Sequence, residues 1–169
     1  MGMLGNSILF QKTREARRLI KIESFLRNND GSFVSIQDVT NSPTDTRHVE
    51  GAIELSIDDI VLLDMKLWDD VDQLWAYIGD MLVNLRKGAE ASTYFPDQPI
   101  KLTFKRLAAG RVLVTLENGR DRRSVATDER ELVDALCRHA RFFFGTMSAL
   151  IPANRGGYDD AVLRFSQDK

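Results

Sequence analysis

The chain has 169 residues, of which 43% are hydrophobic, 28% charged and 8% aromatic. This composition is typical of one ordinary globular domain and excludes disorder as the main state. No run of about 18 consecutive apolar residues occurs, so the sequence predicts no membrane span. The single cysteine, Cys137, excludes an internal disulfide. Together with the lack of a basic, apolar signal sequence, it favours a cytoplasmic protein.

The net charge of −2 hides an uneven distribution along the chain. Residues 54–72 hold seven acidic side chains against one lysine, whereas residues 1–27 and 101–126 carry a basic excess. Nucleic-acid-binding proteins usually show a dominant basic excess with interleaved aromatic side chains. The basic and acidic segments nearly cancel here, so nucleic acid is not the expected partner.

The chain is predicted to begin with a leader and a hairpin. Residues 1–11 carry little periodic signal and are expected to be a poorly ordered leader or a short edge strand. Residues 18–27 suit either a helix face or a buried strand. The Asp30-Gly31 pair that follows, and the β-rich run from Phe33, favour a β-hairpin.

Two further strands are predicted before the first helix. Val49–Ile57 alternates apolar and other side chains with only Gly51 interrupting, which indicates a strand. Asp58-Asp59 then suits a two-residue turn into a short strand at Ile60–Leu63.

The clearest helix prediction covers Leu67–Lys87. Apolar side chains recur there at alternating steps of three and four residues, the period of one helix face. Three aspartates fall in its first turn, Arg86 and Lys87 in its last, and Gly88 follows, as the helix dipole and C-terminal geometry prefer. Residues 89–99, with two prolines, are predicted to be a loop.

A second meander and a last helix complete the prediction. Strands are expected at 100–105, 112–116 and 121–126, where apolar and polar side chains alternate between turn-forming residues. The last helix begins at Thr127 or Asp128 with a capping box and ends before Pro152, leaving 153–169 as a tail. The side chains expected to face the core are Leu132, Leu136, Ala140, Phe143, Phe144 and Met147.

We find no internal repeat and no linker long enough to separate two domains, so residues 1–169 are interpreted as one domain. Strands, a helix, strands and a helix follow one another along the chain. This order predicts an α+β fold of antiparallel β-meanders with two main amphipathic helices packed on one face.

Side chains for common catalytic chemistry are few. The histidines are His48, in a predicted loop, and His139, two positions after Cys137 in the last helix. Side chains two apart on a helix point to nearly opposite sides, so this pair forms no local nucleophile and base. Cys137 is expected in the core or at its boundary and His139 on the helix surface. The sequence contains no triad, zinc or phosphate-loop motif, and we assign no catalytic residue, cofactor or metal ligand.

The main candidate site is acidic. Five aspartates from the predicted turn and helix start are expected to form one exposed face that attracts a basic protein partner. A calcium or magnesium site is an alternative for the aspartates of this segment, which include Asp64, although the EF-hand ligand order is missing. A solvated turn and helix start is the plainest interpretation. The five residues are Asp58, Asp59, Asp69, Asp70 and Asp72.

Two other functions remain open. Arg120, Arg122 and Arg123 flank a predicted turn, and a pocket near them, Tyr94 and Asp97 would suit a small ligand or an enzyme. A solvated hairpin tip is the simpler interpretation of the three arginines. A homo-oligomeric structural module, joined through an unpaired sheet edge, is the third interpretation.

Three stretches of the chain together resemble a known kind of protein. They are Val49-Glu50-Gly51 with Leu62-Leu63-Asp64, Leu67-Trp68-Asp69-Asp70 through Leu74-Trp75, and Tyr94-Phe95-Pro96-Asp97-Gln98-Pro99-Ile100. The pattern resembles small bacterial proteins similar in layout to immunity proteins of polymorphic toxin systems. In that layout a helix with a tryptophan precedes a β-hairpin, and the final helix follows an acidic step, here Thr127-Asp128-Glu129. The resemblance implies a protein that occludes its partner and has no catalytic residues.

Overall fold

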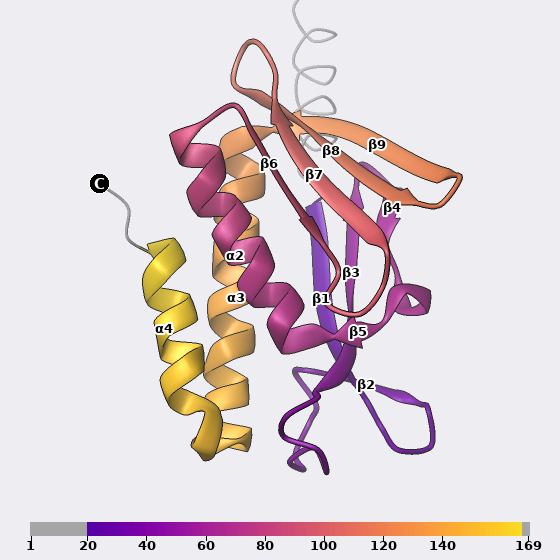
Figure 1. Ribbon diagram of the computed structural model, residues 1–169, viewed down its shortest axis with the longest axis vertical. Coiled ribbons are helices and arrows are strands. Elements are labelled where there is room, and N and C mark those ends of the chain that lie inside the picture. The colour runs from indigo at the N-terminus through magenta and orange to yellow at the C-terminus, as the bar shows by residue number, and fades with distance from the viewer. Residues whose placement is uncertain (1–19, 167–169) are drawn as a thin grey trace, which may run out of the picture.

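The computed structural model describes residues 20–166. It confirms an α+β fold with two antiparallel sheets (Figure 1). The leader expected at residues 1–11 lies outside the described residues, and no helix within them is long and apolar enough to span a membrane. In chain order the elements are β1 (Ile20–Arg27), β2 (Phe33–Ser35), β3 (Glu50–Ile57), β4 (Ile60–Leu63), the 3₁₀ turn η1 (Met65–Leu67), β5 (Asp69–Asp70), α2 (Val71–Lys87), β6 (Glu90–Tyr94), β7 (Ile100–Arg106), β8 (Arg111–Asn118), β9 (Asp121–Asp128), α3 (Glu129–Leu150), the 3₁₀ turn η2 (Pro152–Asn154) and α4 (Arg155–Ser166).

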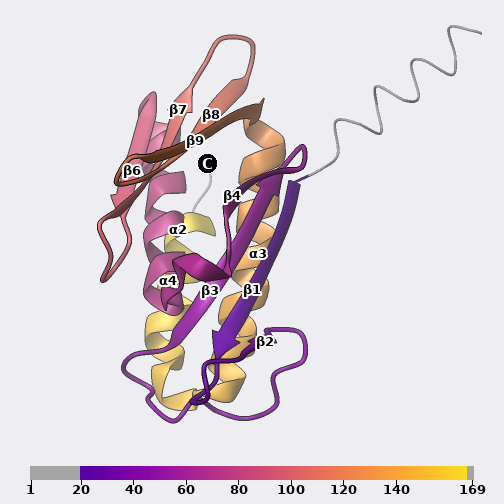
Figure 2. The same ribbon diagram turned by 90° about the vertical axis from the view of Figure 1, so that its right-hand side faces the viewer.

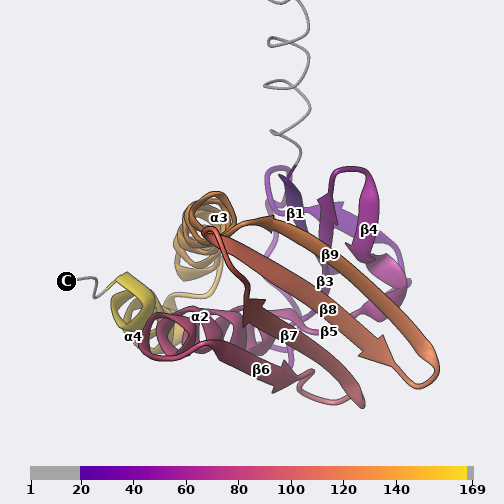
Figure 3. The same ribbon diagram turned by 90° about the horizontal axis from the view of Figure 1, so that it is seen from above.

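The two sheets lie on the same side of the helices. The first has the strand order β2-β1-β3-β4, with β5 pairing to β3, and its strands β1 and β3 lie in front of α3 in Figure 2. The second is a meander with the order β6-β7-β8-β9, and its edge strand β6 runs beside α2 (Figure 3). The helices α2, α3 and α4 form one layer beside these sheets (Figure 1).

The hydrophobic core is built around aromatic side chains of α2 and α3. Trp75 is fully buried, with its ring centroid 6.2 Å from that of Phe143, which is in turn 5.4 Å from Phe144. All six side chains predicted to face inward from the last helix are buried. Phe142, whose ring faces outward, is 46% exposed.

Two backbone features set the geometry of β3. Asp58 and Asp59 have φ angles of 50° and 66°, so they form the predicted tight turn to β4. At Gly51, a Cβ atom would lie 2.2 Å from the carbonyl oxygen of Phe25 and 2.7 Å from a methyl group of Val71. Glycine at this position therefore allows β1, β3 and the start of α2 to approach closely.

The structure corrects three predictions of local structure. The helix predicted from Leu67 begins at Val71, because residues 69–70 extend to pair with β3 instead. The predicted loop at 89–99 contains strand β6, which hydrogen-bonds along β7. The predicted tail at 153–169 contains η2 and α4, whose Phe165 is 1% exposed and packs against α2 at Gly79.

Candidate functional site

The five predicted partner-binding aspartates do not form one exposed face. Asp58 and Asp59 are exposed at the β3–β4 turn, whereas Asp69 and Asp70 are only 4% and 5% exposed. The eight residues of β3 separate the turn from this pair by roughly 25 Å at about 3.3 Å per residue. Asp72 points to α4, where it accepts a hydrogen bond of 2.9 Å from the Tyr158 hydroxyl. The physical reason is the pairing of β5 with β3, which draws residues 69–70 beneath the surface.

Asp69 and Asp70 nevertheless line a cavity of about 370 Å³, which we call the acidic pocket. Its wall comes from the start of β3, from the segment between η1 and α2, and from the loop between β6 and β7. Four carboxylates face one lysine there, so the lining is strongly negative. The lining residues are Glu50, Lys66, Trp68, Asp69, Asp70, Asp97 and Gln98.

The carboxylate of Asp69 holds the walls of the acidic pocket together. It accepts a hydrogen bond of 2.7 Å from the backbone N–H of Asp70, and its two oxygens lie 3.2 and 3.1 Å from the backbone nitrogen of Asp97. The Gln98 side chain also donates to the carbonyl oxygen of Trp68. These bonds fix the β6–β7 loop to β5, so Asp69 positions the pocket.

Asp70 is a buried carboxyl in the acidic pocket. Burial raises the pKa of its carboxyl, and the negative charges of Asp97 and Asp69 act in the same direction. His48 Nδ1, 3.4 Å from an Asp70 oxygen, opposes this rise. A cation entering the pocket would favour the ionised form of Asp70 and would be attracted by it.

A guanidinium group is already bound beside this pocket, within the protein itself. Arg27 pairs with Glu50 at 3.0 Å, and its guanidinium carbon lies 4.3 Å from the centroid of the Trp68 ring. A carboxylate together with an indole face is a favourable environment for a planar guanidinium. The rim of the acidic pocket thus has the chemistry that recognises arginine.

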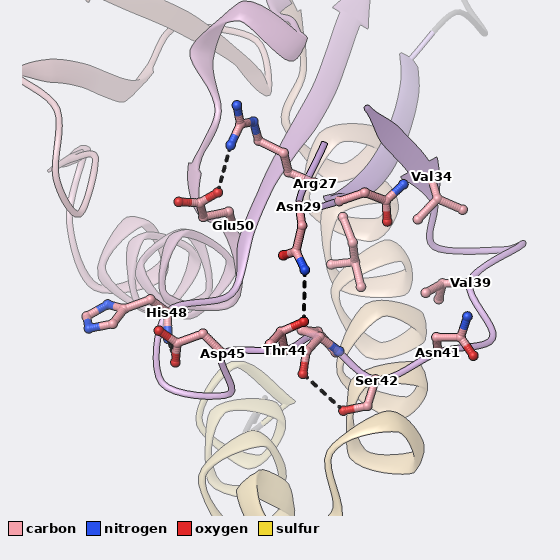
Figure 4. A pocket seen from close by; sticks show the side chains of 13 residues that line it. Arg27, Asn29, Val34, Val39, Asn41, Ser42, Thr44, Asp45, His48 and Glu50 are labelled. Carbon is pink, nitrogen blue, oxygen red and sulfur yellow. Dashed lines mark hydrogen bonds and ion pairs between the residues drawn. The ribbon is translucent and has the colours of Figure 1, made fainter. Parts of the chain in front are cut away.

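A second cavity, of about 470 Å³, adjoins the acidic pocket at Glu50, and we call it the loop pocket. Figure 4 shows the Arg27–Glu50 pair at one side of it and Asn29 donating to the Thr44 hydroxyl at another, with His48 directed away. Five of its thirteen lining residues carry neutral amides or hydroxyls, and the others are apolar or charged or, in one case, histidine. It extends the polar surface around the acidic pocket along the loop after β2.

The residues considered for nucleophilic chemistry do not meet in the fold. His139, expected on the helix surface, is partly buried, and its ring stacks on Trp75 at 5.5 Å. Its Nε2 lies 3.1 Å from the Ser24 hydroxyl, which also accepts from the Trp75 indole N–H at 2.9 Å. Ser24 is fully buried, so a substrate has no access to it. Cys137 is buried, as expected, and lies in a different cavity from His48.

The pocket expected near Tyr94, Asp97 and the β8–β9 hairpin is not found among the five cavities described. Asp97 lines the acidic pocket, whereas Tyr94 is 60% exposed on β6. Arg123 pairs with Asp121 at 2.9 Å and with Asp64 at 3.5 Å, so its charge is largely compensated. The β-sheet register places Tyr94 and Arg122 three strands apart.

Of the four carboxylates in the acidic pocket, sequence reasoning assigned Asp69 and Asp70 to the predicted acidic face. It assigned Asp97 to a different predicted site, the pocket near Tyr94. It did not single out Glu50. The signal was present, because the three stretches that carried the family resemblance supply Glu50, then Trp68 to Asp70, and then Asp97 and Gln98. These stretches are distant in sequence and meet only in the folded chain.

Within residues 20–166, no three His, Cys, Asp or Glu side chains are arranged to hold a metal ion. Comparison of the chain with models of protein families, with curated proteins and with solved structures gives no match. The functional argument therefore rests on the site itself.

Proposed function

We propose that the protein is a non-catalytic binding protein, of the kind represented by immunity proteins, and that its acidic pocket receives a cationic side chain of a basic partner protein. The observation that carries the proposal is that four carboxylates converge on one cavity, whose lining includes a single lysine, Lys66. The four are those of Glu50, Asp69, Asp70 and Asp97. Arg27 and His48 compensate part of this negative charge. The excess that remains steers a basic protein toward the site and discriminates against acidic ones.

The environment of Arg27 supports an arginine as the inserted side chain. Glu50 is 45% exposed, so it retains surface for a second guanidinium from a partner. The flanking loop pocket offers amide and hydroxyl groups for polar contacts around that anchor. An anchor arginine surrounded by a polar rim is a common arrangement at protein interfaces.

The test is a tagged pull-down from the source cells at low and moderate salt, with bound proteins identified by mass spectrometry. The wild type is compared with Asp97→Lys, which reverses an exposed charge in the pocket, and with Asp160→Lys, a matched reversal at an exposed position of α4. We expect one stoichiometric basic protein that is retained by D160K, lost by D97K and released at moderate salt. Retention by D97K at the wild-type level would exclude the acidic pocket as the interface.

If the partner is a toxin, as the resemblance implies, its toxicity gives a second readout. Cells that express the partner should be protected by the wild type and by D160K but not by D97K. Equal protection by all three variants would contradict the proposal.

A further inference from the structure

A cavity of opposite charge lies between α2 and α3. Its volume is about 500 Å³, and three guanidinium groups line it against one carboxylate. The lining residues are Arg86, Val133, Asp134, Cys137, Arg138 and Arg141. We call this cavity the arginine pocket.

The helices fix where these arginines lie. Asp134, Arg138 and Arg141 are spaced by four and then three residues, so they share one face of α3. Arg86, in the last turn of α2, donates to the carbonyl oxygen of Phe165 on α4 at 2.9 Å. The pocket is therefore framed by rigid elements rather than by a loop.

The two α3 arginines that line the pocket, Arg138 and Arg141, lack a carboxylate partner among the described residues. Arg141 donates to the neutral Ser166 hydroxyl at 3.3 and 3.1 Å, and its guanidinium carbon lies 5.9 Å from the Phe165 ring centroid. Arg138 forms no hydrogen bond or ion pair with residues 20–166. By contrast, Arg106 pairs with a glutamate at 2.8 Å. Positive charge at the arginine pocket is thus available to a ligand.

We propose that the arginine pocket binds an oxyanion of the phosphate class, carried by a small molecule. Guanidinium groups present forked N–H donors that match the geometry of phosphate oxygens, and several of them around one cavity favour a multiply charged anion. The site is separate from the acidic pocket. Asp70 of the acidic pocket caps the start of α2 and lies 16 residues before Arg86, which corresponds to about 24 Å along the helix. The proposal does not depend on the function proposed above.

The experiment titrates the full-length protein with inorganic phosphate at constant ionic strength, with chloride as the replaced anion. Binding is measured by isothermal titration calorimetry and by the rise in Tm that a ligand of the folded state produces. The variants are Arg138→Gln and Arg141→Gln, with Arg130→Gln as the control, because Arg130 is exposed on α3 outside the pocket.

We expect phosphate to raise the Tm of the wild type and of R130Q alike. R138Q and R141Q should each weaken phosphate binding by about tenfold, the usual effect of removing one charge-assisted hydrogen bond. Both variants should fold, since the two side chains are exposed. An unchanged affinity in R138Q and R141Q, or no phosphate-dependent stabilisation of the wild type, would overturn the proposal.

Discussion

Replacing Asp69 by alanine should destabilise the protein strongly, because its carboxylate is buried and hydrogen-bonded. An exposed aspartate, by contrast, usually contributes little. The substitution removes the acceptor for the backbone N–H groups of Asp70 and Asp97, bonded at 2.7 Å and at 3.1 to 3.2 Å. A hydrogen bond to a charged group contributes about 1.5 to 3 kcal/mol, so two of them amount to about 3 to 6 kcal/mol. Relief of repulsion between neighbouring carboxylates offsets part of this loss. We therefore expect Asp69→Ala to lower the free energy of unfolding by about 3 kcal/mol.

The assay is urea denaturation followed by tryptophan fluorescence, with the change in midpoint converted at constant m-value. Asp69→Asn keeps one acceptor oxygen and should cost less than Asp69→Ala. Asp160→Ala, on the exposed side of α4, is the control and should stay within about 0.5 kcal/mol of the wild type. If Asp69→Ala behaves like this control, Asp69 does not position the acidic pocket.

Three further predictions concern the core and its buried polar groups. Burial lowers the pKa of His139, so the folded state binds fewer protons than the unfolded state, and stability should fall as the pH drops below about 6.5. In urea melts at pH 5 and pH 7, His139→Gln should lack this part of the pH dependence. An equal loss of stability between pH 7 and pH 5 in both proteins would refute the prediction. Burial raises the pKa of Asp72, so its contribution to stability is present at low pH and lost as the pH rises through the folded pKa. Asp72→Asn, which keeps an acceptor for Tyr158, should therefore raise the Tm at pH 7 but not below a pH of about 4, and a lower Tm at pH 7 would contradict this. Phe165→Ala should cost about 3 to 5 kcal/mol in urea melts, whereas a cost below about 1 kcal/mol would mean that α4 does not belong to the core.

Elements with strong local periodicity could be predicted from the sequence, and elements that depend on a neighbour could not. The α3 helix shows its apolar stripe and its Asp128 cap, which accepts from the Glu131 N–H at 2.9 Å. Strand β6 lacks such a pattern and is extended because it pairs with β7. The Gly156-Gly157 pair obscures the helical signal of α4, which is stabilised by the burial of Tyr158 and Phe165.

For the candidate site, too, the local sequence predicted some properties, whereas others depend on contacts between distant segments. The sequence identified Asp69 and Asp70 as electrostatically important, but it placed them on an exposed helix start. Their burial arises from the pairing of β5 with β3 and from the loop that contains Asp97, contacts between residues far apart in the chain. Glu50 became part of the site for the same reason, because Gly51 lets β3 and α2 approach closely.

The central claim is that the acidic pocket binds a cationic side chain, and it can be tested without knowledge of the partner. We would titrate the ¹⁵N-labelled protein with N-acetyl-arginine amide, using N-acetyl-glutamine amide as the uncharged control. We predict saturable shifts at the backbone amides of Glu50, Asp70 and Asp97 and at the Trp68 indole N–H, all of them suppressed in Asp97→Lys and retained in Asp160→Lys. Shifts of equal size with the glutamine compound, or none at these four groups, would contradict the claim.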